Sequence, residues 1–99
     1  MYSPLPPDIT IKDSNIHGLG LYATQDIAAD TNLGISHYFF EEKIVRTPLG
    51  GFYNHSYSPN CRSKYVYPKG KITRSCLVTL REIKAGEELT AYYRIQPLP

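Results

Sequence analysis

The sequence is broken into short runs of strand-forming residues by frequent turn formers, and this pattern restricts the folds open to it. Its 99 residues include 7 Gly and 8 Pro, and no extended stretch has the apolar repeat of a long amphipathic helix. Alternating, β-branched or aromatic runs between Gly, Pro, Asp and Asn are typical of strands. The runs that we predict as strands are Asp8–Lys12, Gly20–Ala23, Asn32–Phe40, Lys43–Arg46, Lys64–Tyr67, Ile72–Arg74, Ser75–Leu80 and Glu88–Tyr93.

A chain of this kind is expected to form one small, mostly-β domain. Many short strands joined by tight turns favour β architecture, and 99 residues suffice for one hydrophobic core but not for two. Pro68–Lys71 has the composition of a turn and predicts a hairpin between the runs on either side. We therefore predict a single domain over 1–99, with a flexible Pro-rich lead at 1–8 and a short tail at 94–99.

Two segments of the chain, 26–33 and 82–89, resemble each other weakly. In both, an acidic residue is followed by Ile, Ala and Leu at the same spacing. Each copy has the pattern of a turn that leads into a strand. Four matches in eight positions are also within reach of chance, so both explanations stay open.

Basic residues are concentrated in the second half of the chain, although the net charge is only +2. Eight Lys or Arg lie between Lys43 and Arg81, and this span contains no Asp or Glu. A basic face could attract phosphates. The dense Lys/Arg run of a nucleic-acid patch is absent, so we favour alternating solvent positions on strands for these cations. A nucleic-acid partner is therefore not expected, and a small basic β-domain that binds nucleic acid stays a second alternative function.

The two cysteines and the apolar content give no sign of a metal site, secretion or a membrane. Cys61 and Cys76 belong to no CxxC pair and have no matched His pair, so we predict no metal centre. The N-terminal residues do not form the apolar core of a signal peptide. No apolar run is long enough to span a bilayer. We expect a soluble, intracellular protein.

Three segments are candidates for parts of one binding site. Gly18-Leu19-Gly20 lacks the third glycine and the helical pattern of a dinucleotide fingerprint, and by itself predicts only a turn. Asn54–Asn60 sets an Asn-His-Ser run against a Pro-Asn turn, which is typical of a rigid loop that presents polar groups. Lys84–Tyr93 is a Gly turn followed by a strand ending in two tyrosines. A serine-protease triad is a poor fit, because no nucleophile elbow surrounds any Ser.

In this order, the three segments resemble the SET-domain protein lysine methyltransferases. Gly18–Ala23 resembles the cofactor turn of that family, and Asn54–Cys61 resembles its Asn-His-Ser-x-x-Pro-Asn motif. Gly86–Tyr93 resembles its Gly-Glu-Glu-Leu-Thr segment, which ends in tyrosine. The resemblance extends from Ile9 to Tyr93, and the last two motifs are specific. The short chain resembles the minimal single-domain members from viruses, phages or bacteria.

The resemblance implies a fold and a chemistry. The fold would be the SET-domain β-clip, with a C-terminal pseudoknot that brings the second and third motifs together. The reaction would transfer the methyl group of S-adenosylmethionine to the ε-amine of a lysine in a protein substrate, with no metal ion. The amine must be neutral to attack, and burial of a lysine in an apolar channel favours its neutral form. The protein would contribute alignment and electrostatic stabilisation.

Carried over residue by residue, the resemblance assigns roles in such a site. Tyr93 would orient the methyl group and the lysine amine, and Tyr38, by its position in a strand, is a candidate second tyrosine of the lysine channel. Asn54 and His55 would hold the amino-acid part and the adenine of the cofactor. Backbone contacts to the cofactor would come from His17, Gly18, Leu19 and Gly20.

The chain also departs from the family pattern. Gly51 stands where many members have Arg, Tyr57 where Cys is frequent and Tyr92 where Asp is common. Only thirteen residues, Phe40–Phe52, stand where members place a helical subdomain that helps to hold the substrate peptide. Because a lysine channel needs walls on several sides, we expect a second copy or the substrate to supply one, and a homodimer is thus an expectation. The first alternative function is a catalytically weak SET-fold module that binds the cofactor or a protein.

Overall fold

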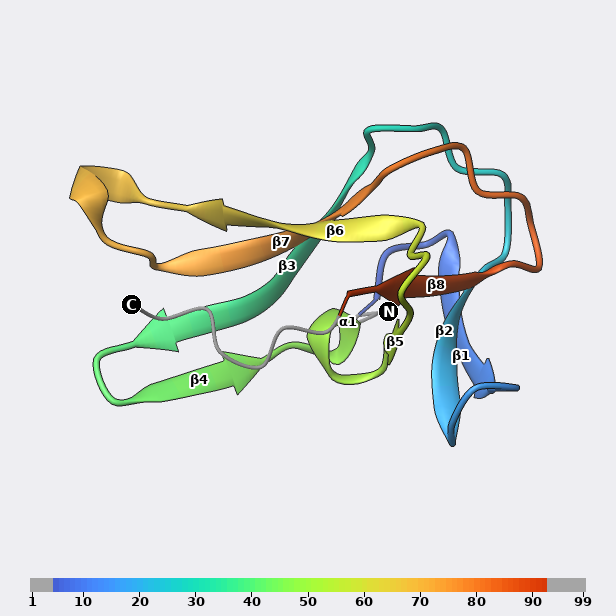
Figure 1. Ribbon diagram of the computed structural model, residues 1–99, viewed down its shortest axis with the longest axis horizontal. Helices are drawn as coiled ribbons and strands as arrows, with labels where there is room; N and C mark the ends of the chain where they lie inside the picture. Colours follow the sequence, from blue (N-terminus) through green and yellow to red (C-terminus); the bar gives the residue numbers. More distant parts are fainter. Residues whose placement is uncertain (1–4, 93–99) are drawn as a thin grey trace.

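The computed structural model describes residues 5–92, which are built almost entirely of β-strands (Figure 1). Two short helical turns occur among these residues: α1 (Pro48–Gly51) and the 3-10 helix η1 (Pro68–Gly70). The mostly-β prediction is therefore confirmed. The strands are β1 (Ile9–Asp13), β2 (Leu19–Ala23), β3 (Asn32–Phe40), β4 (Lys43–Arg46), β5 (Asn54–His55), β6 (Cys61–Val66), β7 (Arg74–Thr79) and β8 (Glu88–Ala91).

Most strands lie where the sequence pattern predicts them, but β5, two residues inside the segment predicted as a polar loop, was not predicted. β6 begins at Cys61, before the predicted run, because the chain there already pairs with both β7 and β8. The predicted runs Ile72–Arg74 and Ser75–Leu80 form one shorter strand, β7, which begins at Arg74 and ends at Thr79. The Thr73 amide closes the hairpin by donating to the Val66 carbonyl at 3.0 Å. α1 was not predicted. It begins at Pro48, after Thr47, whose side chain accepts a hydrogen bond from the Gly50 amide.

The last described strand joins the two halves of the sheet. The strand order is β1-β2-β8-β6-β7-β3-β4, and β5 pairs with β8 away from this path. β8 is antiparallel to β2 but parallel to both β5 and β6. In Figure 1 the β1–β2 hairpin and the long β6, β7, β3 and β4 strands lie on opposite sides of β8 and β5. The second and third sequence motifs therefore lie side by side, as the resemblance implies.

The weak internal repeat has a structural counterpart. Ile27 and Ile83, which occupy equivalent positions in the two copies, form an isolated antiparallel bridge. Each amide donates to the other carbonyl, at 2.7 and 2.8 Å, and both side chains are buried. The equivalent residues of the two copies are thus paired with each other in the core.

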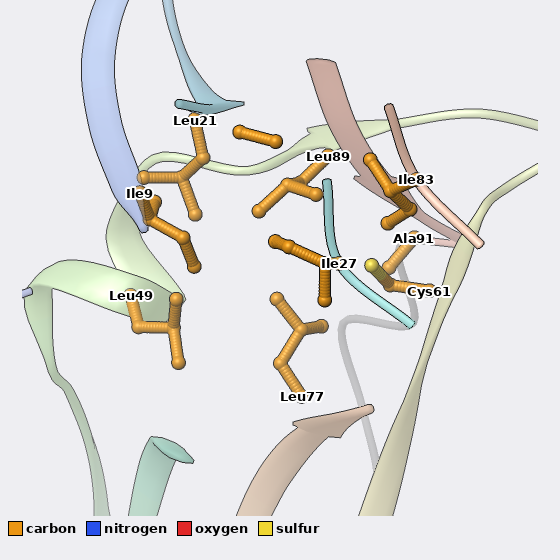
Figure 2. Close-up of a cluster of buried hydrophobic side chains, with 10 residues drawn as sticks. Ile9, Leu21, Ile27, Leu49, Cys61, Leu77, Ile83, Leu89 and Ala91 are labelled. Carbon is orange, nitrogen blue, oxygen red and sulfur yellow. The ribbon is translucent and has the colours of Figure 1, made fainter. Parts of the chain in front are cut away.

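The hydrophobic core lies between the β1–β2 hairpin and the inner face of the strands β6, β7, β3 and β4, which we call the larger sheet. Figure 2 shows Leu21, Leu77, Ile83 and Leu89 pointing toward one another from different segments, and all four are fully buried. Cys61 is part of the same cluster. Burial raises the pKa of its thiol to about 12, so it is neutral at physiological pH. A core thiol in this state packs as a small apolar side chain.

α1 packs against β3 at a position that admits no side chain. A Cβ at Gly50 would overlap the carbonyl oxygen of Ser36 in β3. The same stretch of β3 also accepts hydrogen bonds from the Thr47 side chain and amide, at 2.7 Å on Ile35 and 3.0 Å on Ser36. These contacts fix the start of the segment that leads into β5. Gly51, the next residue, is exposed, and a Cβ there would meet no atom within 4 Å.

We predict that Gly50→Ala lowers the free energy of unfolding by about 1–3 kcal/mol, because either α1 or β3 must shift to admit the methyl group. Gly51→Ala is the matched control and should change it by no more than about 0.5 kcal/mol. Urea denaturation followed by circular dichroism measures both. Equal effects at the two positions would show that close packing of α1 on β3 is not what Gly50 provides.

Candidate cofactor and active site

The three sequence motifs meet around the side chain of Asn54. Its amide nitrogen lies 3.2 Å from the carbonyl oxygens of both His17 and Leu19, which belong to the Gly-containing turn. It lies 2.7 Å from a carboxylate oxygen of Glu88, at the start of β8. The Ser14 hydroxyl is 3.1 Å away. We call these groups, which lie on three separate segments, the Asn54 cluster.

The surroundings fix the orientation of the Asn54 amide. A primary amide has two N–H donors and one oxygen acceptor, and here four acceptor atoms face its nitrogen. The reversed orientation would place the amide oxygen against the Glu88 carboxylate and two carbonyl oxygens. Because this arrangement would be repulsive, the amide must donate toward the turn and β8.

Glu88 and Ser14 complete the cluster, although sequence reasoning did not single out either of them. The Ser14 hydroxyl lies 2.8 Å from both carboxylate oxygens of Glu88 and also accepts the Ile16 amide at 2.9 Å. The Tyr22 hydroxyl lies 3.3 Å from Glu88. The second Glu of the Gly-Glu-Glu-Leu segment was a usable signal for Glu88, since a carboxylate that begins a strand beside a polar loop can bind that loop.

Glycine is favoured at the two positions of the turn for different structural reasons. Gly18 has φ +48, a left-handed conformation that glycine adopts readily, and a Cβ there would meet nothing within 4 Å. A Cβ at Gly20 would overlap the carboxylate of Glu88. Gly20 is thus required for the approach of Glu88 to β2. Its predicted role as a backbone contact to a cofactor stays a prediction.

His55 lies next to the Asn54 cluster within a group of aromatic rings. Its ring packs edge-on against Tyr57, with centroids 4.6 Å apart, and at a tilt against Tyr92, with centroids 5.0 Å apart. Tyr57 and Tyr92 are themselves 5.8 Å apart. Tyr57 is 84% exposed, so this group presents open aromatic surface beside β5. Sequence reasoning noted Tyr57 and Tyr92 only as departures from the family pattern.

Of the two tyrosines predicted to be catalytic, Tyr38 makes no described contact with the Asn54 cluster. Tyr38 lies on β3, where it pairs with Val45 of β4 and stacks on Phe40 with centroids 6.5 Å apart. In Figure 1 the β3–β4 hairpin extends away from β1 and β2, on the other side of α1 and β5. Tyr93 lies outside the described residues. Both roles stay predictions.

The chemistry of the Asn54 cluster suits a cationic ligand. It combines a carboxylate, two backbone carbonyl oxygens and a hydroxyl, and no described Lys or Arg forms an ion pair with Glu88. Among residues 5–92, no three His, Cys, Asp or Glu side chains are grouped closely enough to hold a metal ion. S-adenosylmethionine carries a sulfonium, an ammonium group and an adenine ring. The acceptors of the cluster and the rings beside it therefore fit that molecule.

The sequence profile of the SET domain matches residues 37–94, which is more than half of the chain. The chain belongs to the SET-domain family. The recognition of this family from the three motifs is thus confirmed. The matched region contains two of the three motifs, those around Asn54 and Glu88.

Curated relatives of this SET-domain chain are histone-lysine N-methyltransferases. A histone H3 lysine-4-specific enzyme of Candida albicans is 32% identical over 119 aligned positions, which cover 89% of this chain but 11% of the relative. A histone H3 lysine-36-specific enzyme of Mycosarcoma maydis is also 32% identical, over 89% of this chain and 12% of its own length. The chain thus spans only about a ninth of the length of these relatives.

Solved structures show the same fold. A candidate histone methyltransferase of Plasmodium falciparum superimposes with a TM-score of 0.68 at 19% identity, over 91% of this chain and 96% of that one. A humanized Polycomb Repressive Complex 2 from Chaetomium thermophilum, bound to an inhibitor, gives a TM-score of 0.71 at 21% identity, over 89% of this chain and 15% of that one. At this low identity the two structures establish the SET fold and nothing further. The helices among residues 5–92 of this SET domain are all too short or too polar to cross a bilayer.

We predict that Asn54→Asp destabilises the SET domain more than Asn54→Ala does at about pH 8, because it sets a second carboxylate against Glu88. Two facing carboxylates raise the pKa of one of them in the folded state. The penalty should therefore be small near pH 4 and grow to about 1–3 kcal/mol as the pH rises through that pKa.

Urea denaturation of both variants at several pH values gives the measurement. The Ala variant is the control, since it removes the amide without adding a titratable group. Equal losses of stability in the two variants at every pH would show that the Asn54 amide does not donate to Glu88.

Proposed function

We propose that this SET domain transfers the methyl group of S-adenosylmethionine to the ε-amine of a lysine in a protein substrate. The observation that carries the proposal is the Asn54 cluster, in which one amide links the Gly-containing turn to the strand of the third motif. Three motifs far apart in sequence supply neighbouring polar groups that suit the ammonium and sulfonium groups of this cofactor.

The cofactor would be held by groups on both sides of Asn54. The carbonyl oxygens of His17 and Leu19 would accept hydrogen bonds from its ammonium group, and the Glu88 carboxylate would favour its positive charge. His55, packed against Tyr57 and Tyr92, would lie against the adenine. Bound in this way, the cofactor would supply a methyl group activated by a positively charged sulfur, which would leave as a neutral thioether.

The residues of this chain would align the acceptor rather than activate it by acid–base chemistry. A lysine must lose its proton to act as a nucleophile, and an apolar channel lowers its pKa. Tyr93 would fix the amine in line with the methyl–sulfur bond through its hydroxyl, with Tyr38 as a second candidate. Alignment of this kind can account for a large part of a rate enhancement.

Histone H3 is the first protein substrate to test, because relatives at 32% identity are named for its lysines 4 and 36. A peptide rich in lysine also suits a site that contains the carboxylate of Glu88. The alternative function is a module of the same fold with little turnover. It is favoured by the shortness of Phe40–Phe52, the segment where family members place a subdomain that helps to hold the substrate peptide.

The same short segment supports a homodimer. The 119-position alignment with the Candida albicans relative is longer than this chain, so that relative has residues that this one lacks. A second copy would supply the missing wall of the lysine channel. Light scattering at the protein concentration used in the assay tests this directly. A monomer with full activity would contradict the dimer but not the reaction.

We predict that the protein binds S-adenosylmethionine with a dissociation constant in the micromolar range, and that Asn54→Ala weakens this binding at least about 10-fold, since it removes the central group of the cluster. Calorimetry on the folded proteins measures both. Gly51→Ala is the control, because Gly51 is exposed and contacts no group of the cluster. Unchanged affinity in Asn54→Ala would contradict the assigned site.

We predict that Tyr93→Phe lowers kcat for transfer of a radiolabelled methyl group to histone H3 by roughly 100-fold while cofactor affinity is kept, because only a hydroxyl is lost. Tyr67→Phe removes a hydroxyl from an exposed residue before η1 and should leave kcat unchanged. Parallel loss of cofactor binding and transfer in Tyr93→Phe would mean that Tyr93 has a structural role.

A further inference from the structure

The register of the larger sheet places four cations on one face. β6 pairs with β7 so that Lys64 lies opposite Cys76 and Val66 opposite Arg74. Directly opposed residues in an antiparallel pair point to the same face, and alternate residues along a strand share that face. The cations brought together in this way are Arg62 and Lys64 of β6, Arg74 of β7 and Lys43 of β4.

This face is the one turned away from the core. Leu77 and Cys61, which point to the opposite side of β7 and β6, are fully buried in the hydrophobic cluster. On the other side, Arg62 and Lys64 of β6 are exposed, whereas Val78 and Cys76, which lie opposite them on β7, are buried. We call this side of β6, β7, β3 and β4 the outer face.

Aromatic side chains lie among these cations. Tyr38 is opposite Arg74, and Phe40, two residues further along β3, is opposite Lys43. The rings of Tyr38 and Phe40 stack on each other with an interplanar angle of 24°. Phe40 is 57% exposed, although it is a large apolar residue. Tyr67, at the turn that joins β6 to β7, is also exposed.

The cations of the outer face are not neutralised by acidic neighbours in the described part of the chain. Arg62, Lys64, Arg74 and Lys43 form no ion pair with a described acidic residue, whereas Arg81 and Lys84, which lie outside these strands, do. Two more exposed cations, Lys69 and Lys71, flank the turn beyond Tyr67. The acidic residues nearest in sequence, Glu41 and Glu42, lie in the turn between β3 and β4 rather than on the strands.

We infer that the outer face binds single-stranded nucleic acid. The cations would contact successive phosphates, and unpaired bases would stack on Phe40, Tyr38 and Tyr67. A duplex hides the faces of its bases, so exposed rings contribute little to duplex binding. An acidic peptide would neutralise the cations but has no planar groups that would need the rings. The outer face shares no residue with the Asn54 cluster, and it shares only Tyr38, the second candidate for the lysine channel, with the proposed methyl transfer.

The test is fluorescence anisotropy with a labelled oligothymidylate, roughly 15 nucleotides long, over a range of salt concentrations. We expect binding whose affinity falls steeply with salt. Lys64→Ala should reduce the slope of log affinity against log salt by about 0.7, the loss of one phosphate contact on a single strand. Lys84→Ala is the charge-matched control, because Lys84 is exposed, pairs with Asp26 and Glu82, and lies in the loop before β8. Lys84→Ala should leave the slope of log affinity against log salt nearly unchanged.

Stacking is tested at Phe40, because Tyr38 is also a candidate for the lysine channel. Phe40→Leu keeps an apolar side chain without a π face and should weaken binding by about 10-fold, whereas Phe40→Tyr should bind like the parent protein. Phe40 is exposed, so each variant should fold, and denaturation curves check this.

Three results would overturn the inference. The first is no binding at low salt by the folded protein. The second is an equal loss of affinity in Lys64→Ala and Lys84→Ala, which would mean that binding depends on the overall charge of the protein and not on the outer face. The third is a duplex of the same sequence, or polyglutamate, binding as tightly as the single strand while Phe40→Leu has no effect. Loss of methyl transfer with intact oligonucleotide binding would bear on the proposed function alone.

Discussion

The side-chain amide of Asn54 is the contact on which the arrangement of this SET domain's polar motifs depends. It donates toward two carbonyl oxygens of the Gly-containing turn and toward Glu88 of β8. No apolar contact could replace it, because the groups that it joins are all acceptors and would repel one another without a donor between them. The turn is held against the sheet by this amide and by the hydroxyl of Ser14.

Much of the fold could be predicted from sequence because its signals are local. Strand periodicity and turn residues placed β1, β3 and β4 well, and two specific motifs indicated the family. What the sequence could not supply is contact between distant segments. Glu88 and Ser14 are 74 positions apart, and neither has a local pattern that marks it as a partner of the other. α1 was missed since four residues with two glycines carry little helical signal.

The same limit applies to the charged residues. Along the chain, the cations between Lys43 and Arg81 are spread out, and this spacing did not favour a phosphate-binding surface. Only the pairing of β6 with β7, and of β7 with β3, shows that several of them share a face with Tyr38 and Phe40. Strand register, which depends on long-range pairing, decides whether scattered charges become a surface.

The central position of β8 has a consequence for how the chain folds. β8 pairs with β2 near the start of the chain and with β5 and β6 from its middle, so the core cannot close until residues 88–91 are available. Contacts between such distant segments make folding slow relative to helical domains of the same size. During synthesis, Leu21 and Leu77 would remain exposed until Leu89 leaves the ribosome. Chains interrupted before β8 should therefore be insoluble and depend on chaperones.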